Sequence, residues 1–237
     1  MELNTPLKTP AEALNDPAVD SLRQDDARRA ARNAAALALS NVSAKGLLFV
    51  WQLLLARLLG AEGYGVYGTI GALLAVGAAI PDFGMGLIVI RDVARRPQDG
   101  GRYLGATLAL QPLLAVLGYG VLIIAALLLG YDSTLRALLA LAALNLLVDA
   151  LGNMCHNQLL ALERMVIPAI ISTGHIALLI ALAGIALATD GGLWGLYIAT
   201  LIAGVVRSGV YWLALLRTGT RPVFPVDRIV ARGLLTN

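Results

Sequence analysis

The residues of this sequence most able to carry chemistry are ionisable side chains inside long apolar stretches. Lys45, Asp82, Asp149 and Arg207 each lie well within such a stretch. A charge at the centre of a membrane helix costs about 2.5–3.5 kcal/mol, so each needs a ligand, water or an opposite charge beside it. Two interpretations stay open. The residues bind a charged substrate, or buried ion pairs, Lys45 with Asp149 and Arg207 with Asp82, fix the order of the helices.

Helical spacing places polar residues beside three of these charges. Because successive residues of an α-helix are about 100° apart, Asn41, Lys45 and Gln52 fall within about 40° of arc. Similar stripes surround Asp149 and Arg207, and a polar stripe on an apolar helix faces protein or water and not lipid. The candidate substrate-binding residues are therefore Lys45, Asn41, Gln52, Arg207, Asn145 and Asp149.

Three other residues are candidates for a structural or gating role. Arg57 lies about 160° from the first stripe, near the end of its apolar segment, where a long side chain can reach the lipid headgroups. Asp82 and Gly84 belong to an Asp-Phe-Gly sequence that is typical of a turn. His156 and His175 are interpreted as hydrogen-bonded structural residues.

The elements that must position these side chains are membrane-spanning helices. Of the 237 residues, 58% are hydrophobic and 14% are charged, which excludes a water-soluble globular enzyme. Six apolar segments are long enough to cross a bilayer, and none alternates polar and apolar residues as a membrane β-strand does. The fold class is therefore all-α and polytopic, with spans at 34–59, 66–90, 103–129, 135–158, 166–188 and 193–216.

The distribution of basic residues orients these spans. Fourteen of the 18 Lys and Arg residues fall in the segments on one side, two on the other and two within spans. This bias predicts that both termini are cytoplasmic. Residues 1–32 form a polar tail, 33–217 the membrane lobe and 218–237 a C-terminal segment. Lys45, Asp82, Gln111, Asp149 and Arg207 then lie roughly 12–17 Å from the cytoplasmic ends of their spans, which predicts a cavity open to the cytoplasm.

Motifs of catalysis and metal binding do not occur in the sequence. Cys155 is the only cysteine, so no intramolecular disulfide forms, and no HExxH, GxSxG or P-loop motif is found. We expect no enzymatic activity, no metal site, no cofactor and no nucleic-acid partner.

Two stretches of sequence resemble a known family. RLLGAEGYGVYG at 57–68 joins the first two spans, and PDFGMGLIVIRDVAR at 81–95 closes the second and enters a basic loop. Together with LERM at 162–165 and the order of spans, they resemble the oligosaccharide flippases of the multidrug/oligosaccharidyl-lipid/polysaccharide export superfamily. The likeness covers about 33–235.

The resemblance implies a fold and a function. The family has a MATE-like fold of two six-helix lobes around a central cavity. Its members carry undecaprenyl-diphosphate-linked oligosaccharides across the bacterial inner membrane for O-antigen, capsule or exopolysaccharide. Cationic cavity residues would engage the diphosphate, a role that falls on Lys45 and, without a matching motif, on Arg207. Asp82 would support helix packing or a gate. The implied partners are membrane lipids, a polysaccharide polymerase and glycosyltransferases.

The sequence departs from the family at its C-terminus, because it stops where a seventh helix would begin. It is therefore expected to supply one lobe, completed by a separate second half or by a second copy, or to come from a truncated gene. Two alternatives stay open. A multidrug or cation antiporter of the same superfamily would use Asp82 and Asp149 to hold cations, and a truncated chain would be a non-transporting membrane scaffold.

Overall fold

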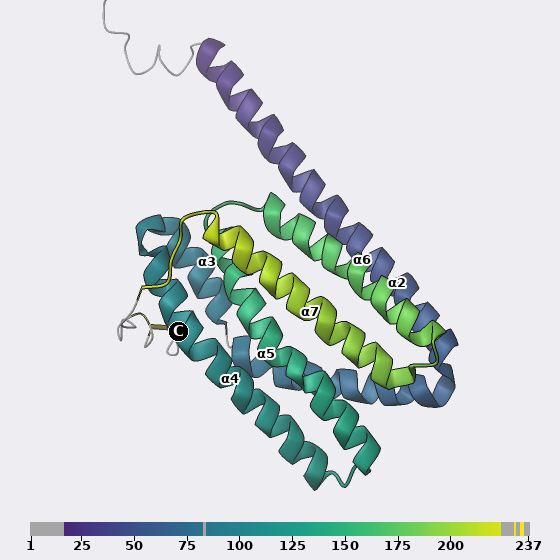
Figure 1. The fold of residues 1–237 in the computed structure, drawn as a ribbon. Coiled ribbons are helices and arrows are strands. Elements are labelled where there is room, and N and C mark those ends of the chain that lie inside the picture. The colour runs from purple at the N-terminus through teal and green to yellow at the C-terminus, as the bar shows by residue number, and fades with distance from the viewer. Residues whose placement is uncertain (1–16, 83, 224–229, 231–232, 235–237) are drawn as a thin grey trace, which may run out of the picture. The chain divides into compact units, whose positions relative to one another are not determined.

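The computed structural model describes the backbone of residues 17–82, 84–223, 230 and 233–234, and the side chains of most of these from Lys45 onward. Every element in this part of the chain is helical (Figure 1). In order, the helices are α2 (Pro17–Asp82), α3 (Met85–Arg95), the 3-10 turn η1 (Pro97–Asp99), α4 (Gly100–Leu128), α5 (Ser133–Ala161), α6 (Val166–Ala188) and α7 (Gly192–Leu216).

Residues 1–46 and 47–237 form two separate units. Of the first unit, the structure gives the helical backbone of α2 from Pro17 onward. The second unit contains the remainder of α2 and all later helices, and it carries the packing described below.

In the part of the chain that the structure describes, five helical segments are long and apolar enough to cross a membrane, which makes the chain a multi-pass membrane protein. The last four predicted spans correspond to α4, α5, α6 and α7 within a few residues at each end. The remaining segment, Leu48–Pro81, comes first along the chain and covers parts of both the first and the second predicted span. Six spans therefore stay a prediction, because the structure joins the first two into one element.

A single glycine divides that element. Gly60 has φ 68° and ψ 179°, so the helix is interrupted there although α2 continues on both sides. This region of backbone space is open essentially to glycine alone. Figure 1 shows the blue ribbon turning sharply within α2. The position of the break agrees with the predicted boundary between the first two spans, at 60–65.

The second predicted span ends earlier than residue 90. α2 stops at Asp82, and Gly84, with φ 76°, precedes a new helix that begins at Met85. The 11 residues of α3 extend about 17 Å, too short to cross a bilayer. The apolar pattern predicted one helix because both pieces are apolar, whereas the left-handed backbone at Gly84 breaks it.

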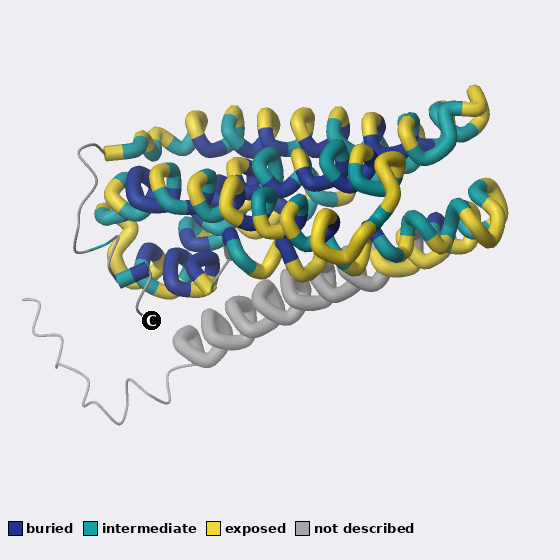
Figure 2. The backbone as a smooth tube through the Cα atoms, turned by 90° about the horizontal axis from the view of Figure 1, so that it is seen from below, coloured by how far each residue is buried: buried dark blue, intermediate teal, exposed yellow. Residues whose placement is uncertain are grey.

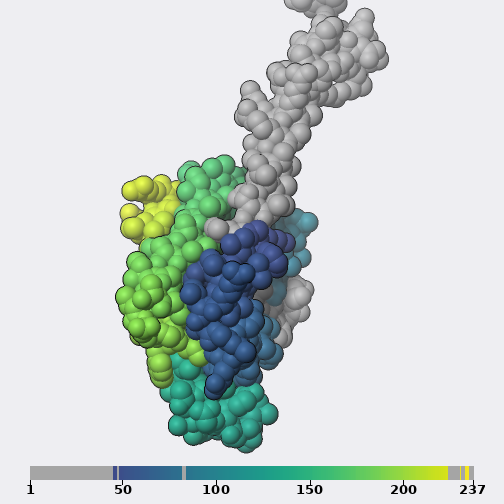
Figure 3. Space-filling model, turned by 90° about the vertical axis from the view of Figure 1, so that its right-hand side faces the viewer, coloured from purple at the N-terminus to yellow at the C-terminus, as the bar shows by residue number. Residues whose placement is uncertain are grey.

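α5 and α7 lie at the centre of the second unit. α7 packs along α5 and α6, and α4 packs along α5. Near one end of the bundle Ile70 of α2, Leu139 of α5 and Tyr197 of α7 share an apolar cluster. Trp51 and Leu55 pack on α6 and α7, and Figure 3 shows blue α2 residues beside the green residues of those helices. Buried residues face other helices and exposed ones face outward (Figure 2).

The opposite end of the bundle is basic. The backbone N–H of Val223, beyond α7, donates to the carbonyl of Gly101 in α4 at 3.0 Å, and Leu159 of α5 packs with Leu215 of α7. These contacts bring together what we call the basic end: Arg91, Arg95, Arg96, Arg102, Arg164, Arg217 and Arg221. The charges near the other end are mixed: Arg57, Glu62, Asp132, Arg136 and Asp190. This gathering of arginines follows the predicted charge bias, while the side of the membrane stays a prediction.

We expect Gly60→Ala to lower the stability of the chain by about 1–3 kcal/mol, because alanine disfavours the backbone angles of Gly60. A Cβ at this position meets no neighbouring atom, so the loss would come from the backbone alone. Gly68→Ala is the matched control, since Gly68 lies in the same helix with equally open surroundings and no positive φ. Thermal unfolding in detergent measures both, and equal melting temperatures would contradict the assignment.

Candidate functional site in the helix bundle

An ion pair joins two helices inside the bundle. Arg207 on α7 donates through Nη2 to Oδ1 of Asp149 on α5 at 2.6 Å. The side chains are 18% and 34% exposed, respectively. A charge-assisted hydrogen bond of this length is strong where lipid and protein exclude water. The pairing differs from both pairs considered from the sequence, which joined Lys45 to Asp149 and Arg207 to Asp82.

Small residues explain why α5 and α7 come close enough for this contact. A Cβ added to Gly204 of α7 would lie 2.5 Å from Oδ1 of Asn145, and one added to Gly152 of α5 would lie 2.5 Å from Oγ of Ser208. Ser208 also donates its hydroxyl to the carbonyl of Val148 at 2.9 Å. Two glycines and a serine therefore let the helices approach and set the ion pair between them.

The ion pair lies among polar atoms that have no hydrogen-bond partner in the described part of the chain. Asn145 donates through Nδ2 to Oδ2 of Asp149 at 3.4 Å, while its own Oδ1 is buried without a hydrogen bond. Nε of Arg207 and Oε1 of Gln111 on α4 are likewise unpaired among the described residues. An unsatisfied buried polar group costs about 1–3 kcal/mol. These atoms therefore mark a place where water or a polar ligand would be stabilised.

A small cavity opens beside Asp149. Its volume is about 80 Å³, and α2, α4 and α5 line it through Ala78, Pro81, Gln111, Leu146, Asp149, Ala150 and Asn153. Pockets that enclose a drug-sized ligand measure about 300–1,000 Å³, so this cavity has room for water and not for an oligosaccharide. The site in this unit can present charge and hydrogen-bonding groups, but it cannot enclose a large polar ligand by itself.

A second polar group links α5, α6 and α7 nearer the basic end. The hydroxyl of Tyr211 lies 3.0 Å from Nδ1 of His156 and 2.9 Å from Oγ of Ser172. Nδ1 of His175 lies 3.2 Å from the carbonyl oxygen of Ala203. Both histidines are thus hydrogen-bonded, as predicted. Ser172 was not singled out from the sequence, because a serine in an apolar helix carries no signal of its partner.

The predicted stripe on α2 is only partly described. Gln52 accepts from the hydroxyl of Tyr64 at 3.4 Å and donates to that of Tyr67 at 3.3 Å, across the break at Gly60. The tyrosines were missed as partners because the break reverses the chain and brings residues 12 and 15 positions away beside Gln52. Tyr67 also stacks on Tyr197 of α7, with ring centroids 6.3 Å apart.

The other candidate residues either take no part in the ion pair or have side chains that the structure does not describe. Lys45 belongs to the first unit, is exposed and forms no ion pair with any described residue. Arg57 is exposed, and Gly84 caps the N-terminus of α3. The side chains of Asn41 and Asp82 lie outside the described residues. Of the six substrate-binding candidates, the structure thus brings together Asn145, Asp149 and Arg207.

Fold and site define the class of this protein: a multi-pass, all-helical membrane protein with a charged pair inside its bundle. The model of the family described as polysaccharide biosynthesis protein matches residues 30–231. Since that match covers most of the sequence, the chain belongs to this family. No curated protein and no solved structure gives a significant match to it. The predicted resemblance is therefore confirmed at the level of polysaccharide biosynthesis.

We expect Asp149→Leu and Arg207→Leu each to lower stability by about 1–3 kcal/mol, because each leaves one charge unpaired in a partly exposed site. The double variant should lose less than the sum of the two, since it removes both charges. Thermal unfolding in detergent closes this double-mutant cycle. Asp149→Asn is the control that removes the charge but keeps the shape, and strictly additive losses would show that the pair is uncoupled.

Proposed function

We propose that this protein takes part in flipping an undecaprenyl-diphosphate-linked oligosaccharide across the bacterial inner membrane, for O-antigen, capsule or exopolysaccharide. The observation that carries the proposal is an arginine held inside an apolar helix bundle in a member of the polysaccharide biosynthesis family. The resemblance of 57–68 and 81–95 to oligosaccharide flippases supports the finer assignment.

The physical task of such a protein is to lower the cost of moving charge through hydrocarbon. A lipid diphosphate carries about two negative charges, and losing their hydration in lipid would be prohibitive. Lysine and arginine side chains replace that hydration with charge-assisted hydrogen bonds. The polyprenyl tail stays in lipid throughout, and rocking of one lobe against another exposes the headgroup to the far side. No covalent step is needed, so the proposed activity is transport and not catalysis.

The headgroup needs more room than the cavity beside Asp149 offers. That cavity measures about 80 Å³, whereas pockets for drug-sized ligands measure about 300–1,000 Å³. We therefore propose that the path lies between this lobe and a second one. Arg207, whose Nε is unpaired among the described residues, would contribute to the wall of that path. Lys45 is proposed as a further cationic contact for the diphosphate, as the family resemblance implies.

Cation antiport receives less support from the site. An antiporter needs an acidic side chain free to hold a cation, whereas Asp149 already has Arg207 at 2.6 Å. Binding a cation there would require the arginine to leave. The alternative of a non-transporting scaffold makes no demand on the ion pair, so loss of transport in a point variant separates it from the proposal.

We expect Lys45→Ala to abolish export of surface polysaccharide, because the variant removes the cation proposed to meet the diphosphate. Lys45→Arg should retain part of the activity, since it keeps the charge. The assay uses cells whose surface polysaccharide depends on this protein and measures both exported polymer and lipid-linked units left on the inner leaflet.

Arg136→Ala is the matched control for this experiment. It removes one positive charge from the end of the bundle where charges are mixed, beside Asp132, and should leave export unchanged at equal membrane level. Normal surface polysaccharide with Lys45→Ala would refute the role of Lys45. Normal polysaccharide with the whole protein deleted would refute flipping itself.

A further inference from the structure

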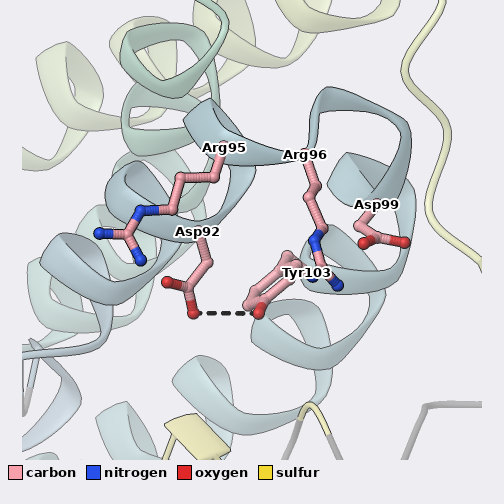
Figure 4. Close-up of a pocket in the computed structure, with 5 residues that line it drawn as sticks. All are labelled: Asp92, Arg95, Arg96, Asp99 and Tyr103. Atoms are coloured by element: carbon pink, nitrogen blue, oxygen red, sulfur yellow. Dashed lines mark hydrogen bonds between the residues drawn. The ribbon is translucent and has the colours of Figure 1, made fainter.

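A larger cavity lies at the basic end, apart from the ion pair. It measures about 250 Å³ and lies between the C-terminal end of α3 and the first turn of α4 (Figure 4). Its lining residues are Asp92, Arg95, Arg96, Asp99 and Tyr103. The volume is several times the share of one water, about 30 Å³, so the cavity has room for a phosphate group together with water.

Local structure builds this cavity. α3 ends at Arg95, and Arg96 has φ −140° and ψ 77°, so the chain leaves the helix and returns through η1 into α4. The hydroxyl of Tyr103 in α4 donates to Oδ2 of Asp92 in α3 at 3.1 Å, the contact drawn in Figure 4. This hydrogen bond ties the two helices together across the cavity and sets its width.

The two acids of the cavity are already neutralised by arginines that do not line it. Nε of Arg91 donates to Oδ1 of Asp92 at 2.7 Å, and Nη1 of Arg102 donates to Oδ1 of Asp99 at 3.1 Å. The hydrogen bond from Arg91 is the main reason that the pKa of Asp92 is lowered, so this carboxylate stays ionised and paired at neutral pH.

Two positive charges are left over in the lining. Arg95 and Arg96 are exposed, and neither forms an ion pair with any described residue. The N-terminus of α4, a helix of 29 residues, adds a partial positive charge at the same place. The cavity therefore has a net positive character although its lining contains equal numbers of acids and arginines.

The surface of α3 indicates where this cavity lies in the membrane. Leu87, Arg91 and Arg95 are four residues apart and form one exposed stripe, with Leu87 76% exposed. An apolar residue followed by two arginines toward the loop matches hydrocarbon followed by headgroups. Arg164, Arg217 and Arg221 lie at the same end and extend the positive field.

We infer that the cavity lined by Arg95 and Arg96 binds the phosphate group of an anionic membrane lipid at the basic end. The planar guanidinium groups match phosphate oxygens in pairs, and basic pockets of this kind between membrane helices recognise lipid headgroups. The headgroup depth of α3 favours a lipid phosphate over free phosphate. This inference concerns lipid binding and does not depend on the proposed translocation.

The test measures binding of phosphatidylglycerol to the full-length chain in detergent by native mass spectrometry. Arg95→Gln with Arg96→Gln should bind this lipid about tenfold more weakly than the unchanged chain. Arg217→Gln with Arg221→Gln is the matched control, because it removes the same charge from the same end outside the cavity, and it should weaken binding far less. Arg95→Lys with Arg96→Lys should bind more tightly than the glutamine variant but more weakly than the unchanged chain, because lysine keeps the charge and lacks the planar guanidinium group.

Three results would overturn the inference. The first is equal loss in the two glutamine variants, which would show attraction by the general field and not by the cavity. The second is equal binding of phosphatidylcholine, whose headgroup carries no net charge. The third is complete displacement of phosphatidylglycerol by millimolar inorganic phosphate, which would make this a site for the free ion. Melting temperatures of all variants check that they are folded. If the glutamine variant unfolds, the affinity of the lysine variant for phosphatidylglycerol, compared with that of the unchanged chain, tests the inference instead.

Discussion

The cost of holding charge inside an apolar bundle is the constraint on which the architecture of this protein depends. Asp149 and Arg207 meet that cost together, at 2.6 Å, between α5 and α7. The contact requires the two helices to pack closely, which Gly152 and Gly204 permit. Once α5 and α7 are fixed, α4 and α6 pack on their outer sides. The ion pair therefore fixes which helices lie side by side. Neighbouring polar atoms without a hydrogen-bond partner among the described residues could bind water or a polar ligand.

The two ends of the bundle differ in their charges. Charges near Asp132 and Asp190 are mixed, whereas seven of the described arginines lie at the other end. At that end Arg91 and Arg102 form ion pairs with Asp92 and Asp99. Arg95 and Arg96, which line the cavity beside these acids, form no ion pair with any described residue. The two proposals, for the interior pair and for the surface cavity, both concern recognition of phosphate.

Prediction from the sequence was most accurate where a helix is bounded by polar residues and turns. The four spans from α4 to α7 were located within a few residues, because Asp132 and the polar residues near Glu163 and Asp190 separate apolar runs. It was less accurate around Gly84. Hydropathy does not record a backbone angle, so the early end of the second span, before Gly84, was not visible in the pattern of apolar residues.

The sequence by itself determined the class of the protein: its apolar content, its long helices, the gathering of arginines and the family likeness all follow from residue types and their order along one chain. Only the tertiary structure decided the partners. Arg207 pairs with Asp149, Gln52 forms hydrogen bonds with two tyrosines beyond Gly60, and Arg95 and Arg96 form no ion pair with any described residue. The physical reason is that periodicity gives the face of a helix on which a side chain lies, whereas pairing depends on which other face packs against it and at what height.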